Sequence, residues 1–184
     1  MAFPSIHFIF LFLPITLLLY YLLPYRAWKH SILVLASLIF FAWADFSRLP
    51  VLIGSVLFNY LAGILLSTLL VKGKTVAARV VIWLGVAANI ALLAVYKYLP
   101  LYLNAINPNL AACRALSGIL MPLGISYFTF SDISYLFDVY HKALPAERNL
   151  LTFSAYFIMF PKLVQGQITR LKEVQSDLNK PVLT

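Results

Sequence analysis

The amino-acid sequence predicts an all-α, polytopic transmembrane helical bundle. Of its 184 residues, 62% are hydrophobic and 11% are charged, and the mean hydropathy is +0.90, whereas soluble domains contain about 45–50% apolar and about 25% charged residues. A helix needs roughly twenty predominantly apolar residues to cross a bilayer. About six runs of this kind are present, at 6–23, 28–46, 50–71, 76–99, 116–139 and 150–168. We therefore expect five to six membrane segments.

The first run, 6–23, is predicted to be a retained anchor and not a secretory signal. No basic residue precedes it, and no small-residue cleavage site follows it before Arg26, although a signal peptide has both features. Pro14 predicts a kink, because proline removes a backbone hydrogen bond, and neighbouring helices can satisfy the freed carbonyl. The single cysteine, Cys113, allows no internal disulfide.

The third and fourth runs combine small residues with asparagine at helical spacing. The residues concerned are Gly54, Ser55, Asn59, Ala62 and Gly63 in one run, and Gly85, Ala88 and Asn89 in the other. Small residues let membrane helices approach closely, and asparagine forms hydrogen bonds across such contacts. We therefore interpret Asn59 and Asn89 as packing residues in preference to catalytic ones.

The basic residues lie mainly between the apolar runs. The net charge is +8 and the pI is about 9.7, and Lys and Arg gather in the connections 24–30, 72–79 and 141–149. Cytoplasmic loops of membrane proteins carry such an excess, so these connections are predicted to be cytoplasmic and the N-terminus extracytoplasmic. A nucleic-acid-binding protein would carry its basic residues on one face, so the pattern argues against a nucleic-acid partner.

The fifth run, 116–139, carries the most polar chemistry. Helical pitch places Thr129 and Asp132 near one face, and a carboxylate at membrane depth is costly unless it faces a partner or water. Asp132 therefore predicts an internal polar cavity, with a purely structural pairing as the alternative. Asp138 and His141 lie three residues apart near the predicted cytoplasmic end, where they either contribute to chemistry or simply contact solvent.

The sixth run ends in polar and backbone-breaking residues. Lys162, Gln165 and Arg170 lie close to Pro161 and Gly166 in "FPKLVQGQITR". Such residues are tolerated at membrane depth where the segment is buried in protein or lines an aqueous cavity. We therefore expect a re-entrant element near 160–170, and its polar side chains are candidates for the same cavity or funnel as Thr129 and Asp132.

Several of these stretches, taken together, resemble the membrane-bound O-acyltransferases, in the branch that includes alginate O-acetyltransferases and the D-alanyl transferase of teichoic acids. The stretches are "LFLPITLLLYYLLP", "LVLASLIFFAWADF", "SVLFNYLAG", "PLGISYFTFSDISYLFDVYHK" and "FPKLVQGQITR". The last two are the specific ones. The similarity extends over essentially all 184 residues, as the N-terminal portion of a larger membrane domain.

The resemblance implies a ring of helices around a thin core, in a bacterial cytoplasmic membrane. There an acyl group, most simply acetyl, would pass from a cytoplasmic donor or carrier to a hydroxyl acceptor handled by extracytoplasmic machinery. No bound cofactor or metal is implied, and the residues do not identify the acyl donor or the acceptor. The family's catalytic base is a membrane-embedded histidine, and none of His7, His30 and His141 matches its motif. The base is therefore expected downstream, and residues 1–184 alone are expected to be inactive.

Three classes of function remain open for the chain. It is part of an O-acyltransferase, a subunit of a transporter or channel, or a noncatalytic membrane scaffold. The family motifs favour the first, whereas Asp132 and a broken sixth segment would also suit the second.

Overall fold

The computed structural model describes residues 8–22, 26–98 and 124–159. Their regular secondary structure is entirely helical, with no strand in these three ranges. The predicted all-α class is therefore confirmed. The predicted runs 28–46, 50–71 and 76–99 start at described residues. The corresponding observed helices begin at Arg26, Leu49 and Thr75, within two residues of the predicted starts.

The N-terminal part contains two apolar helices. A π-helical turn, η1 (Phe8–Phe12), leads directly into α1 (Leu13–Leu22), and Pro14 lies just after this change of helix type. The second helix, α2 (Arg26–Asp45), is followed by a short 3₁₀ turn, η2 (Phe46–Arg48). α1 packs against α2, and the ring of Phe12 in η1 lies 5.9 Å from the ring of Phe40 in α2.

The next two helices form an antiparallel hairpin. α3 (Leu49–Val71) begins with a proline in its first turn, where the missing N–H costs no hydrogen bond, and ends at Lys72. Gly73 then adopts a left-handed φ of 71°, which glycine accepts without a side-chain clash. α4 (Thr75–Leu93) returns along α3 and continues into a π-helical turn, η3 (Ala94–Tyr98).

The last two helices are shorter. α7 (Ile125–Tyr140) begins after Gly124 and ends at His141. α8 (Leu150–Phe157) begins at Asn149, whose side-chain oxygen accepts a hydrogen bond from the backbone N–H of Leu151 at 3.0 Å.

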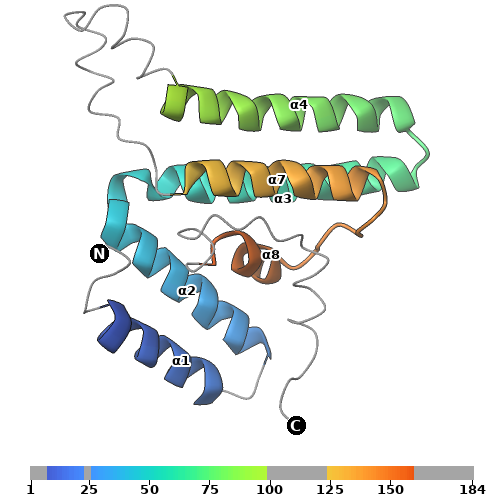
Figure 1. The fold of residues 1–184 in the computed structure, drawn as a ribbon. Coiled ribbons are helices and arrows are strands. Elements are labelled where there is room, and N and C mark those ends of the chain that lie inside the picture. The colour runs from blue at the N-terminus through green and yellow to red at the C-terminus, as the bar shows by residue number, and fades with distance from the viewer. Residues whose placement is uncertain (1–7, 23–25, 99–123, 160–184) are drawn as a thin grey trace, which may run out of the picture.

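α7 packs against three other helices of the described bundle. Figure 1 shows the axes of α3, α4 and α7 roughly aligned. α8 and α2 lie on the side of α3 away from α4, and α1 lies beyond α2. α7 contacts both helices of the α3–α4 hairpin, and α8 contacts α2, α3 and α7. Nine of the sixteen residues of α7 are buried, so this helix is covered on several sides.

The described residues contain two helical stretches that are long and apolar enough to cross a membrane, Phe46–Val71 and Thr75–Tyr98. Phe10–Leu22 and Trp28–Ala44 are apolar but shorter. The expected five to six segments remain a prediction. The sixth run differs from expectation, because α8 ends at Phe157 after eight residues, about 12 Å. The proposed re-entrant stretch at 160–170 lies outside the described residues.

Candidate functional site

Asp132 lies halfway along α7 and is fully buried, with 0% of its surface exposed. Thr129 and Leu136 are one turn away on either side and are also fully buried. This face of α7 is turned toward the α3–α4 hairpin, where Leu136 lies against Gly85. The expectation that Asp132 faces the protein interior agrees with this burial.

Two residues of α3 hold one oxygen of the Asp132 side chain. The hydroxyl of Ser55 donates to Oδ2 of Asp132 at 2.8 Å, and the amide of Asn59 donates to the same oxygen at 2.8 Å. Ser55 and Asn59 are four residues apart and therefore share one face of α3. Buried hydrogen bonds of this kind offset the cost of placing a carboxyl group at membrane depth.

The same amide connects α3 to α4. Asn89 donates to Oδ1 of Asn59 at 2.8 Å, and Nδ2 of Asn59 lies 3.2 Å from Oδ1 of Asn89. Asn89 also donates to the carbonyl of Gly85, one turn back. Ser55, Asn59, Asn89 and Asp132, which we call the polar cluster, thus join three helices. The predicted hydrogen bonding of Asn59 and Asn89 across the helix contact is therefore present.

α7 also buries polar atoms that form no hydrogen bond in the described structure. These are Oδ1 of Asp132 and the hydroxyl of Thr129, and the hydroxyls of Ser131, Tyr127 and Tyr135 are buried on the same helix. A buried polar group without a partner costs about 1–3 kcal/mol. Their concentration on one helix marks α7 as the polar element of an otherwise apolar core.

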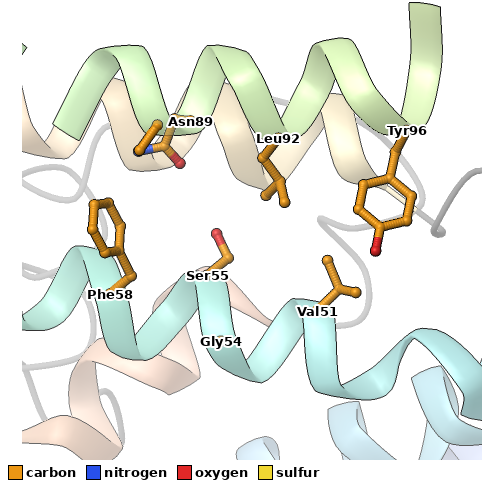
Figure 2. Close-up of a pocket in the computed structure, with 8 residues that line it drawn as sticks. Val51, Gly54, Ser55, Phe58, Asn89, Leu92 and Tyr96 are labelled. Carbon is orange, nitrogen blue, oxygen red and sulfur yellow. The ribbon is translucent and has the colours of Figure 1, made fainter. Parts of the chain in front are cut away.

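A groove between α3 and α4 reaches the polar cluster from the outside. Its volume is about 330 Å³, and Figure 2 shows Ser55 and Asn89 facing each other across it, with Val51 and Tyr96 toward one end. The other lining side chains are mainly apolar. Gly54 borders open space in the groove, because an added Cβ there would meet no atom within 4 Å. Ser55 and Asn89 therefore belong both to the groove and to the polar cluster, whereas Asp132 does not line the groove.

The structure does not bring Asp138 and His141 to the polar cluster. Asp138, on α7, and His141, just after it, follow Asp132 by six and nine residues, about 9 and 14 Å along the helix axis. His141 is exposed, and its Nδ1 lies 2.9 Å from the carbonyl of Phe137. The carbonyl of Asp138 accepts hydrogen bonds from the backbone N–H groups of Ala143 and Leu144. Asp138 and His141 therefore lie at the C-terminal end of α7.

Of the other sequence candidates, Thr129 lies one turn from Asp132 and shares its burial. Lys162, Gln165 and Arg170 lie outside the described residues, so their predicted place in a cavity or funnel stays a prediction. His30 lies on α2, where its Nδ1 is 3.3 Å from the hydroxyl of Thr152 in α8. The sequence did not pair Ser55 and Asn59 with Asp132. Their four-residue spacing on an apolar helix was the available signal.

The hydrogen bonds of the described site hold three helices together. Its donors and acceptors are a carboxyl group, a hydroxyl and two amides, and no histidine is placed in the polar cluster. The described ranges contain no group of three or more His, Cys, Asp or Glu that could hold a metal ion.

The amino-acid sequence of the chain is similar to those of several known bacterial proteins. The chain is 37% identical over 97% of its length to the probable alginate O-acetylase AlgI of Pseudomonas putida and 36% identical over 97% to that of Pseudomonas aeruginosa. It is 36% identical over 73% of its length to the peptidoglycan O-acetyltransferase of Helicobacter pylori.

The chain spans only part of each of these relatives. It covers 37% of the P. putida protein, 35% of the P. aeruginosa protein and 26% of the H. pylori protein. No family model and no solved structure matches the chain.

Proposed function

We propose that this chain, which is similar to alginate O-acetylases, forms part of a membrane-bound O-acyltransferase, an enzyme that transfers an acyl group to hydroxyl groups of a cell-envelope polymer. The observation that carries the proposal is identity of 36–37% over 97% of the chain to alginate O-acetylases. A second relative is a peptidoglycan O-acetyltransferase. Acetyl is therefore the proposed acyl group, and an extracellular polysaccharide or peptidoglycan is the proposed class of acceptor.

The proposed chemistry assigns a framework role to the described residues. In acyl transfer the acceptor oxygen bonds to the acyl carbon while a general base removes the acceptor's proton, and the bond between the acyl carbon and the donor breaks, so that the donor group leaves with a proton. The proposed base is a histidine outside this chain. Helix positions decide how accurately such a base and its substrates meet, because a misplacement of about 1 Å can cost a hundredfold in rate. The polar cluster would hold α3, α4 and α7 in register for this purpose.

The proposed setting is the bacterial cytoplasmic membrane, with the N-terminus extracytoplasmic and residues 72–79 cytoplasmic. The distribution of Lys and Arg supports this orientation. It is tested with Cys113→Ser chains carrying one new cysteine, Thr75→Cys or Asn107→Cys. A membrane-impermeant thiol reagent added to intact cells should label position 107 and leave position 75 unlabelled. The reverse pattern would refute the orientation.

The proposed partners follow from the two sides of this membrane. The acyl group would arrive on a cytoplasmic donor or carrier, without a resident cofactor, and the acceptor would be presented by extracytoplasmic machinery. A transporter role is less well supported, because Asp132 is hydrogen-bonded between helices and does not line the groove between α3 and α4.

The activity is tested by deleting the gene that encodes this chain, with any coding sequence continuous with it, and measuring ester-linked acetate on the envelope polymers. The proposal expects acetate to fall on one polymer and to return when the intact gene is restored. Thr152→Ala, which changes a contact between α2 and α8 away from the polar cluster, serves as a control that should also restore it. Unchanged acetate on every polymer in the deletion strain would contradict the proposal.

A further inference from the structure

The α3–α4 hairpin has what it needs to form in the membrane by itself. Both helices lie within stretches that are long and apolar enough to cross, Phe46–Val71 and Thr75–Tyr98. The turn between them is closed by hydrogen bonds from Gly73 to Leu70 and from Lys74 to Leu69. The reciprocal amides of Asn59 and Asn89 then fix the pair face to face.

α7 lacks these features. It is sixteen residues long and carries Asp132 at its midpoint, and it is not among the described helices that meet the length and hydropathy needed to cross. An aspartate at the centre of a membrane helix lowers the ratio of inserted to non-inserted chains by roughly a hundredfold. The helix therefore depends on a partner that accepts its carboxyl group.

Among the described residues, both hydrogen-bond donors to Asp132 belong to α3. Ser55 and Asn59, which we call the polar notch, both donate to the same Asp132 oxygen at 2.8 Å, while Asn89 contacts Asn59 and not Asp132. Gly63 lies two turns after Ser55, and a Cβ there would meet the ring of Tyr135 at 2.5 Å. The hydrogen bonds to Asp132 and the close contact between Gly63 and Tyr135 thus fix the register of α7 on α3 at two positions along the helix axis.

We propose that the polar notch of α3 is a docking surface for a membrane helix with a carboxyl group at this register, and that α7 enters the bilayer as its partner. The α3–α4 hairpin forms first and α7 inserts stably only against it. The assignment concerns how the protein is built in the membrane and does not depend on the reaction that it catalyses.

The experiment uses the full chain with Cys113→Ser and Ala143→Cys, because position 143 is exposed just after α7. Labelling by an impermeant thiol reagent is measured from both membrane faces on pulse-labelled chains, before misinserted protein is degraded. The notch variant Ser55→Ala/Asn59→Leu should increase severalfold the fraction of position 143 found on the face opposite to its normal one. Adding Asp132→Leu to the notch variant should return it to the normal face, because α7 then inserts without a partner.

Two matched variants separate the notch from general effects. Asn89→Leu breaks the amide pair but leaves the notch intact, and it should leave position 143 on its normal face. Asp138→Leu removes the other carboxyl group of α7 and should not rescue the notch variant. The proposal is overturned if the notch variant labels as the parent chain does, if Asn89→Leu shifts position 143 equally, or if Asp138→Leu rescues as well as Asp132→Leu.

Discussion

Two helices end in the same left-handed turn with different residues in it. After α3 the residue is Gly73, with φ 71°, and after α7 it is Lys142, with φ 57°. In both turns this residue and the next one donate back to the last turn of the helix. An L-residue pays roughly 1–2 kcal/mol in this conformation and glycine does not. The strain is therefore already present at Lys142 and absent at Gly73.

We predict that Gly73→Ala lowers the free energy of unfolding by about 1 kcal/mol. An added Cβ at this position meets no atom within 4 Å, so the loss is conformational and not steric. Lys142→Ala exchanges one L-residue for another and should change stability by less than half as much. Denaturant unfolding in detergent micelles measures both, and equal losses would contradict the argument.

Asn59 and Asn89 form a pair but are not equivalent. Asn59 also donates to Asp132, so Asn59→Ala should cost about 1–3 kcal/mol more than Asn89→Ala, which leaves that bond intact. In a cycle with Asp132→Ala, the cost of Asn59→Ala should shrink, because the shared hydrogen bond is already lost. Additive losses in the same unfolding assay would show that the two side chains do not interact.

At the scale of elements, close helix contact rests on glycines of α3 and α4. A Cβ on Gly63 would lie 2.5–2.8 Å from atoms of the Tyr135 ring, which is itself packed at 5.0 Å from the ring of Phe153. Gly63→Ala should therefore force α7 away from α3, at a cost of about 1–3 kcal/mol.

Gly54→Ala is the matched control for this substitution, because its Cβ meets no atom within 4 Å. Alanine is the better helix former by roughly 1 kcal/mol, so this change should leave stability unchanged or raise it. Thermal denaturation in one detergent gives both values. A loss at position 54 as large as at position 63 would show that close packing is not the cause.

The sequence predicts elements better than it predicts contacts. The apolar runs 50–71 and 76–99 became Leu49–Val71 and Thr75–Tyr98, because run length decides what can cross a bilayer. The run 150–168 did not become one helix within the described residues, since α8 ends at Phe157. Composition also indicated that Asp132 needs a partner. It could not show which helix supplies it, because that depends on the rotation and register of α7 against α3.

The left-handed Lys142 gave no sequence signal either, because lysine is not typical of that conformation. The same is true of the buried hydroxyls of Tyr127 and Tyr135, which look like ordinary interfacial aromatics in the sequence. Their burial follows from the packing of α7 among other elements, and a linear pattern of polarity does not contain that information.

At the scale of the whole molecule, many large apolar side chains lie on the outside. Leu61 on α3 and Trp83 and Leu84 on α4 are each more than 60% exposed. Such a surface is stable only in hydrocarbon or detergent. The protein should therefore remain in the membrane pellet after an alkaline carbonate wash and appear in the supernatant only after detergent is added. Release by carbonate alone would contradict its integral placement.

The connection between α7 and α8 has a mechanical consequence. It is fastened at its start, where the carbonyl of Asp138 holds two backbone N–H groups, and at its end, where the hydroxyl of Tyr60 donates to the carbonyl of Arg148 at 2.6 Å. A connection that is hydrogen-bonded at both ends has little freedom to change length. A translation or rotation of α7 would therefore be transmitted to α8 and to the middle of α3. These three helices would therefore move together as a rigid unit. Any relative motion within the described bundle would have to occur at contacts with the other helices.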